Sequence, residues 1–158
     1  MVPIASKEGV TYFATAKHVI GESTDLIAIN SFTKVKHPAG IIHWISPTVD
    51  LAIVAFRLTT DVVLIAENPP MLRGSKCYSL GHPHPRLPCL VFQGLLQGGY
   101  SFTGDAAPGM SGGAVLDEHG RLLGIITQYL PKRTDNQFTV VSWGSVGFFL
   151  PARLLPLP

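Results

Sequence analysis

The sequence has little of several features that would assign it to a simple class. Only 14% of its 158 residues are charged and the net charge is +2, too small to indicate a nucleic-acid partner. Its two cysteines, Cys77 and Cys89, are too few for a disulfide scaffold. We expect free, partly buried thiols, although their predicted strands are neighbours and a bridge stays open. An apolar content of 46% excludes disorder.

Membrane, export and cofactor signals are also missing. No apolar run approaches the length of a membrane span, and the first eight residues lack the basic and apolar regions of a secretory signal. We therefore expect no membrane partner and, by default, a cytoplasmic location. His82 and His84 have no cysteine or acid nearby, and no phosphate-binding loop of Walker type is present. The expectation is that the protein uses no metal and no cofactor.

No segment has a helical period over three turns. Short apolar stretches alternate instead with Gly, Pro, Asn and Asp, which is typical of all-β proteins. Pro38-Ala39-Gly40 predicts a hairpin turn, and the only helix expected is a short one at Ala152–Leu155. The predicted strands are 10–15, running on toward residue 20, then 26–29, 41–45, 50–56, 77–80, 90–92, 95–96, 114–116, 122–126 and 138–141.

The pattern loosens between the two groups of predicted strands, around Asn68-Pro69-Pro70. We interpret this segment as a crossing between two halves of one domain that covers residues 1–158. The N-terminal half is then about 1–62, the crossing about 63–75 and the C-terminal half about 76–155.

The richest motif is Gly109-Met110-Ser111-Gly112-Gly113. Glycines beside a serine leave room for a substrate carbonyl, and they allow the backbone dihedrals that turn two N–H groups toward one point. Acyl transfer needs this combination of a hydroxyl nucleophile and fixed donors for an oxyanion. A glycine-rich turn between two strands is the alternative interpretation.

Two upstream residues have contexts that suit a catalytic partnership with Ser111. His18 comes just after an apolar strand, and an imidazole can accept and return a proton near neutral pH. Asp50 precedes six apolar residues, and an unpaired charge buried among them would be costly. A hydrogen bond to the far ring nitrogen of His18 would give the carboxylate a partner. The order His, Asp, Ser is that of chymotrypsin-like proteases, whereas in α/β-hydrolases the acid and histidine follow the serine.

The chain resembles a chymotrypsin-like (trypsin-like) serine protease, nearest the HtrA/Deg branch and the compact viral serine proteases. The resemblance rests on TAKHV around His18, VDLAIV around Asp50 and APGMSGGAVLDEHGRLLGI around Ser111. It continues in Leu80–Pro83 and Gly147–Pro151. It implies an all-β fold of two six-stranded antiparallel β-barrels with at most a short C-terminal helix.

The resemblance also implies roles for individual residues. Ser111 would be the nucleophile, His18 the general base and acid, and Asp50 its orienter. The backbone N–H groups of Gly109 and Ser111 would form the oxyanion hole. The strand Ile126-Thr127-Gln128 would pair with an extended peptide or protein substrate.

The chain departs from the family pattern at two places. Secreted digestive proteases carry an acid just before the serine, where this chain has Met110, so activation by N-terminal cleavage is not expected. No PDZ-like domain follows Pro158, so the regulated oligomer of the HtrA type is not assumed and the sequence leaves the oligomeric state open.

Two interpretations of substrate preference stay open. Asp105 stands six residues before Ser111, where related enzymes place the acid that binds Arg or Lys. Alternatively Ala106, Ala107 and Ile126 would line an apolar pocket for a small or medium side chain.

Three hypotheses for function follow from the sequence. The first is a serine endopeptidase that forms an acyl-enzyme on Ser111. The second is a peptide-binding module that uses a protease fold without catalysis. The third is a viral-type protease that processes its own polyprotein.

Overall fold

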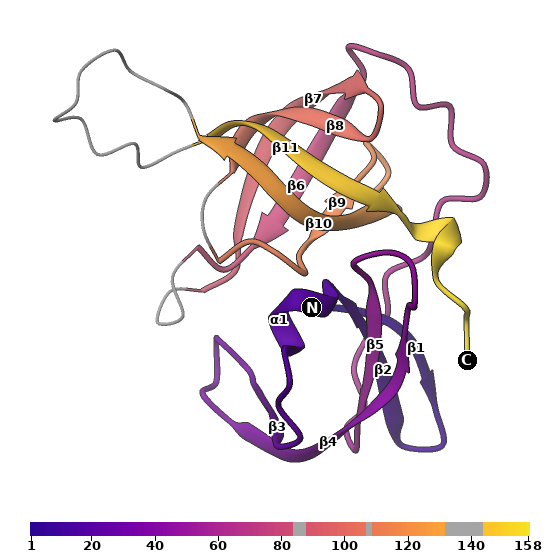
Figure 1. Ribbon diagram of the computed structural model, residues 1–158, viewed down its shortest axis with the longest axis vertical. Helices are drawn as coiled ribbons and strands as arrows, with labels where there is room; N and C mark the ends of the chain where they lie inside the picture. The colour runs from indigo at the N-terminus through magenta and orange to yellow at the C-terminus, as the bar shows by residue number, and fades with distance from the viewer. Residues whose placement is uncertain (84–87, 107–108, 132–143) are drawn as a thin grey trace, which may run out of the picture.

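The computed structural model of the chain describes residues 1–83, 88–106, 109–131 and 144–158 and forms two β-lobes, one above the other (Figure 1). The N-terminal lobe is one antiparallel sheet with the strand order β1-β2-β5-β4-β3. Its elements are β1 (Val2–Lys7), β2 (Val10–Thr15), α1 (Lys17–Ile20), β3 (Leu26–Ile29), β4 (Lys36–Ile45) and β5 (Ala52–Phe56).

The C-terminal lobe is a closed barrel with the order β10-β11-β8-β7-β6-β9. A short 3-10 helix, η1 (Ala152–Leu154), follows its last strand. The strands are β6 (Lys76–Gly81), β7 (Leu90–Gly98), β8 (Ser101–Ala106), β9 (Ala114–Leu116), β10 (Leu122–Pro131) and β11 (Gly144–Pro151).

The predicted all-β class is confirmed, but the predicted pair of six-stranded barrels is confirmed only in the C-terminal half. The N-terminal sheet has five strands and is open, with β1 and β3 at its edges. Closing a barrel requires both edge strands to find a neighbour. In this lobe the order ends at β3, so the sheet curves without closing.

One local prediction in the N-terminal lobe was wrong. The predicted turn at Pro38–Gly40 lies inside β4, where the strand continues although Ala39 has a φ of 59°. The reversal occurs earlier, because the Asn30 carboxamide accepts N–H bonds from Phe32 (2.9 Å) and Thr33 (3.0 Å) and so forms the turn itself.

The strand predicted at 10–15 is confirmed as β2. The segment that follows it, up to residue 20, forms the single helical turn α1, which the sequence did not predict. That turn is the one α-helix of the described residues. The predicted C-terminal helix is present as the 3-10 helix η1. The strand predicted at 138–141 lies outside the described residues.

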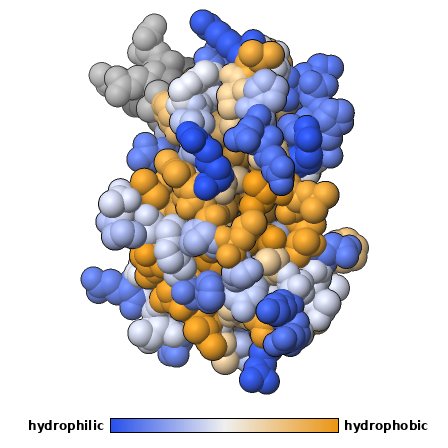
Figure 2. All heavy atoms as spheres, turned by 90° about the vertical axis from the view of Figure 1, so that its right-hand side faces the viewer, coloured by the Kyte–Doolittle hydropathy of each residue, from blue (hydrophilic) through white to orange (hydrophobic). Residues whose placement is uncertain are grey.

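Apolar packing joins the lobes. One cluster of buried side chains includes Ile4, Ala14 and Leu51 of the N-terminal lobe together with Ala114 and Ile125 of the barrel. All five residues of β5 are buried, as expected for a strand that is apolar on both faces. Figure 2 shows apolar atoms gathered across the middle of one side of the molecule, at the level where the lobes meet.

The crossing segment is tied to both lobes by backbone hydrogen bonds. Val63 donates to the Pro3 carbonyl in β1 (2.9 Å), and Ala66 donates to the Leu122 carbonyl in β10 (3.0 Å). The crossing segment is therefore hydrogen-bonded to both the sheet and the barrel. Across the described part of the chain, no helix has the length and apolar character needed to span a bilayer.

Both cysteines are free thiols in different surroundings. Cys77 is fully buried in the barrel core, and this burial raises the pKa of its thiol to about 11. Cys89 directly precedes β7 and is exposed. The thiols are free as expected, but the prediction that they are partly buried was wrong, because Cys77 is buried and Cys89 is exposed.

We expect a thiol reagent such as DTNB to modify one cysteine of the native protein at pH 8 and the second only after unfolding. The thiolate is the reactive form, and Cys77 combines burial with a raised pKa. Stopped-flow absorbance would follow the two phases. In Cys89→Ser the fast phase should disappear; its survival would contradict the assignment.

The turn between β9 and β10 is organised by Asp117. Its carboxylate accepts N–H bonds from His119 (2.8 Å) and Arg121 (2.9 Å), and the Arg121 Nε donates to its other oxygen at 2.8 Å. Burial raises the pKa of Asp117, but these hydrogen bonds outweigh burial and lower the pKa below its usual value.

Asp117→Asn should lower the free energy of unfolding by about 1 kcal/mol at pH 7, because charge-assisted bonds are lost. A lowered folded-state pKa gives stability that is present above the unfolded value, near 3.9, and lost as the pH falls through the folded value. The gap to wild type should therefore shrink at pH 3. Urea unfolding at both pH values measures it, with the exposed Glu118→Gln as control. An equal gap at both pH values would argue against this role.

Candidate active site

His18 is placed by the helical turn that ends the β2 strand. In α1 the Val19 N–H donates to the Ala16 carbonyl (3.1 Å) and the Gly21 N–H to the Lys17 carbonyl (3.3 Å). Gly21 ends the turn with a φ of 58°. The turn lifts His18 out of the sheet, and Figure 1 shows α1 at the junction between the lobes.

Asp50 is presented by a tight turn that is held by Ser46. Ser46 is 3% exposed, and its hydroxyl accepts N–H bonds from Thr48 (3.3 Å) and Val49 (3.1 Å). Its N–H donates to the Leu51 carbonyl (3.0 Å), and its carbonyl accepts from the Lys17 Nζ (3.2 Å). The turn that carries Asp50 is thereby fastened to the residue before His18.

The structure brings His18 and Asp50 together through two hydrogen bonds. The ring Nδ1 lies 2.6 Å from Asp50 Oδ2, and the His18 backbone N–H donates to Oδ1 at 2.9 Å. The sequence argument relied on deep burial of Asp50, and that part was wrong. Its side chain is 31% exposed and that of His18 51% exposed, so the two bonds, rather than relief of a buried charge, fix the pair.

The turn around Ser111 depends on two glycines with positive φ. Gly109 has a φ of 91°, and a Cβ there would lie 2.6 Å from the His82 carbonyl oxygen. Gly112 has a φ of 81° and is buried. Met110 between them is 1% exposed and packs in the barrel core. The position where digestive proteases have an acid is thus an apolar anchor for the turn.

The same turn is pressed against the lobe that carries His18. A Cβ at Gly112 would fall inside the contact radius of the Thr15 hydroxyl and lie 3.3 Å from the Ala16 backbone nitrogen. Thr15 ends β2, and Ala16 precedes α1. The serine turn and the histidine turn are therefore packed backbone to backbone.

The Ser111 hydroxyl points to β10. It donates to the Thr127 carbonyl at 3.4 Å, and within the described residues no hydrogen bond joins it to His18. Thr127 forms a bulge, because Ile126 pairs with Phe149 and Gln128 with Phe148. A bulge of this kind turns a carbonyl out of the ladder, and bulges are common beside active sites.

Within the described residues, no backbone acceptor is bonded to the two N–H groups expected to form the oxyanion hole. Gly112 N–H donates to the Ile126 carbonyl (2.7 Å) and Gly113 N–H to the Met110 carbonyl (2.9 Å). In the described part of the chain the N–H groups of Gly109 and Ser111 have no such acceptor. Two donors beside the serine are therefore available to a ligand oxygen.

The predicted specificity residues are only partly visible. Asp105 and Ala106 end β8, and their side chains lie outside the described residues, as does Ala107. Ile126 is 1% exposed and belongs to the barrel core, which does not suit it to line an open pocket. Gln128 is exposed.

A cavity of about 180 Å³ opens beside the serine turn, on the side of β6 and β9. The sequence analysis did not predict it, because its wall combines distant segments. The lining includes Leu80, His82, Cys89, Gly109 and Ser111. Among the described residues no three His, Cys, Asp or Glu side chains gather as metal ligands.

Gly112→Ala should destabilise the fold much more than Gly120→Ala, which is the matched control. Both glycines have positive φ, 81° and 75°, but nothing lies within 4 Å of a Cβ at Gly120. Gly120→Ala should cost about 1 kcal/mol of unfolding free energy, and Gly112→Ala roughly 2 kcal/mol more, because Thr15 must move. Urea unfolding measures both; equal losses would show that the serine turn does not press on the other lobe.

Comparison with known proteins identifies a family and many solved structures of similar fold. The family of trypsin-like peptidase domains matches residues 4–125. The solved structure of an HtrA-type protease, AlgW with a decapeptide, has a similar fold, with a TM-score of 0.74 and 23% sequence identity. The match covers 96% of this chain and 47% of that one, so the chain spans about half the length of the solved protein. A search of curated proteins found none that matches.

Proposed function

We propose, because the chain belongs to the family of trypsin-like peptidase domains, that it is a serine endopeptidase with Ser111 as nucleophile. The observation that carries the proposal is the His18–Asp50 pair at 2.6 Å, on a turn packed against the serine turn. An imidazole held by a carboxylate beside a serine hydroxyl is the arrangement that acyl transfer requires.

The reaction begins with a rotation of the Ser111 side chain. The hydroxyl leaves the Thr127 carbonyl, a bond of only 3.4 Å, and turns to the free Nε2 of His18. It then attacks the scissile carbonyl while its proton passes to Nε2. Asp50 holds Nδ1–H, so Nε2 is the basic nitrogen of the ring.

The tetrahedral intermediate carries its negative charge on the former carbonyl oxygen. The N–H groups of Gly109 and Ser111 donate to this oxygen and supply most of the electrostatic stabilisation. His18 returns its proton to the leaving amine, and the acyl group stays on Ser111. A water molecule, deprotonated by His18, then releases the acid and restores the serine.

The substrate is a polypeptide in extended conformation that lies along β10. The Thr127 carbonyl faces the serine, and backbone groups of alternate residues in a strand point to the same edge. Tyr129, which was not predicted from the sequence, therefore joins Thr127 as a backbone partner of the substrate. Gln128 lies between them and contributes its side chain. The related HtrA-type structure is described with a decapeptide, which supports a peptide ligand.

For the specificity pocket we propose two forms. Asp105 would be the floor that binds a basic side chain, or Ala106, Ala107 and Ile126 would line an apolar pocket for a small or medium side chain. A buried carboxylate would discriminate strongly between cationic and neutral side chains.

A second candidate function is supported by the orientation of Ser111. With its hydroxyl on Thr127, the protein would act as a peptide-binding module that does not hydrolyse its ligand. The two functions predict different reactivity of the Ser111 hydroxyl oxygen.

Ser111→Ala should reduce hydrolysis of a casein-type substrate by about 10⁶-fold, since the nucleophile is lost. Wild-type protein should also be labelled at Ser111 by a fluorophosphonate, as mass spectrometry would detect. The control is Ser23→Ala, which removes a surface hydroxyl bonded only to the Asp25 carbonyl and should be unchanged. Unlabelled wild type would favour the binding module, and full activity in Ser111→Ala would refute the assignment.

A further inference from the structure

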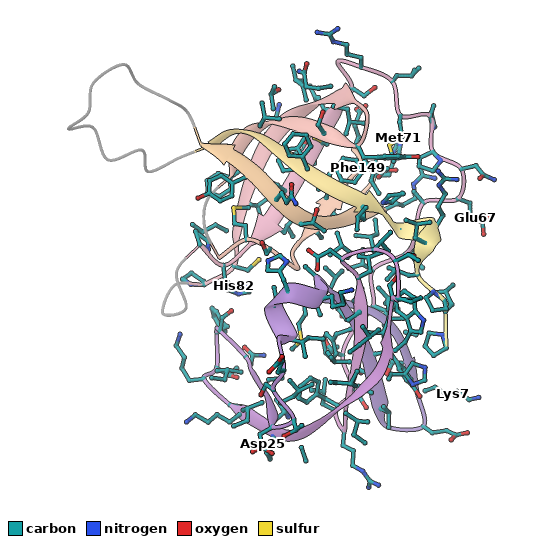
Figure 3. All side chains as sticks on the ribbon, in the orientation of Figure 1. Lys7, Asp25, Glu67, Met71, His82 and Phe149 are labelled. Carbon is teal, nitrogen blue, oxygen red and sulfur yellow. The ribbon has the colours of Figure 1, made fainter. Side chains whose placement is uncertain are left out.

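His82 connects the two lobes through its side chain. It directly follows β6 of the barrel, and its Nε2 lies 3.0 Å from the hydroxyl oxygen of Ser31 in the loop between β3 and β4. Figure 3 shows His82 on the barrel side of the junction, below β6 and toward the N-terminal lobe. The two residues are 51 positions apart in the chain, so the bond ties elements of different lobes.

The backbone of the same residue supports the turn of the candidate oxyanion hole. A Cβ at Gly109 would lie 2.6 Å from the His82 carbonyl and 3.1 Å from that of Pro83. A Cβ at Gly81 would lie 3.0–3.1 Å from atoms of Met110. The segment from Gly81 to Pro83 therefore lies directly against residues Gly109 and Met110.

Ser31 is a firm anchor for this bond. Its loop is closed by Asn30, whose N–H donates to the Val35 carbonyl (2.9 Å) and whose carbonyl accepts from Lys34 N–H (2.8 Å). The Asn30 carboxamide also caps the loop from inside. These bonds hold together the loop that carries the Ser31 hydroxyl.

We infer that His82 is a positioning residue that aligns the oxyanion-forming turn at Gly109 with the lobe that carries His18. The inference rests on the proposed function and extends it to the register between the lobes. His18 and Asp50 belong to one lobe, and Gly109 and Ser111 to the other. The bond between Ser31 and His82 therefore sets the position of the Gly109 turn relative to the N-terminal lobe.

The chemistry of the ring fits a structural bond better than a proton-transfer role. Burial lowers the pKa of His82, and the N-terminal ammonium and Lys34 lower it further. The neutral ring, which can bond Ser31 as donor or acceptor, is therefore the favoured form. The ring nitrogen that reaches the other lobe is already engaged by the serine hydroxyl.

The test is a double-mutant cycle with steady-state kinetics on a peptide substrate. Ser31→Ala and His82→Phe should each lower kcat about fivefold with little change in KM, as expected for loss of one hydrogen bond that acts on the transition state. The double variant should lose no more than either single variant, because both remove the same bond. His82→Gln, which keeps a polar group at similar reach, should restore most of the activity.

Binding of a peptide boronic acid separates positioning from general stability. Its tetrahedral adduct mimics the transition state, so its affinity should fall in parallel with kcat in Ser31→Ala and His82→Phe. A product-like peptide acid should bind as to wild type. Thr33→Val is the control, since the Thr33 hydroxyl bonds within its own loop.

Additive losses, a change in KM alone, or no rescue by His82→Gln would overturn the positioning role. Ser111→Ala in the same assay keeps the two proposals apart. If Ser111→Ala is inactive while Ser31→Ala and His82→Phe are fully active, only the role of His82 is wrong. If Ser111→Ala remains active, the proposed serine chemistry itself is wrong.

Discussion

Apolar packing between the lobes is the constraint on which the candidate site depends. Ile4 and Leu51 of the sheet pack in one cluster with Ala114 and Ile125 of the barrel. Burial of apolar area is non-directional, so it brings the lobes together without setting their register to a fraction of an ångström. The register comes from contacts that tolerate no extra atom, above all the approach of Gly112 to the end of β2.

The two halves of the candidate site are built with different rigidity. On the His18 side, Ser46 holds the Asp50 turn and accepts a bond from Lys17 of α1, and Asp50 binds His18 at 2.6 and 2.9 Å. On the other side, the Ser111 hydroxyl has one long bond to Thr127. Such a division suits the proposed mechanism, in which the Ser111 hydroxyl changes its hydrogen-bond partner while His18 and Asp50 keep theirs. It also explains why the backbone around Ser111, rather than its hydroxyl, carries the strict geometric demands.

Local sequence pattern predicted what local physics determines. The alternation of apolar stretches with turn residues was sufficient to predict the all-β class. The residues that flank Asp50 indicated His18 as its partner, and the His18 Nδ1 lies 2.6 Å from Asp50 Oδ2. The pattern was misleading where tertiary contacts prevailed, as in β4, which runs through Pro38–Gly40. It was silent on closure of the sheet and on the bulge at Thr127, because both depend on pairing between strands far apart in the chain.

The open sheet of the N-terminal lobe has a consequence for the protein in concentrated solution. An edge strand offers unpaired backbone groups to any other extended chain. β1 is partly guarded, because Pro3 has no N–H and its carbonyl already accepts from Val63. β3 has neither protection and carries Ile27 and Ile29 largely exposed. Unwanted association should therefore begin at β3, and a lysine placed there would be the natural remedy for poor solubility.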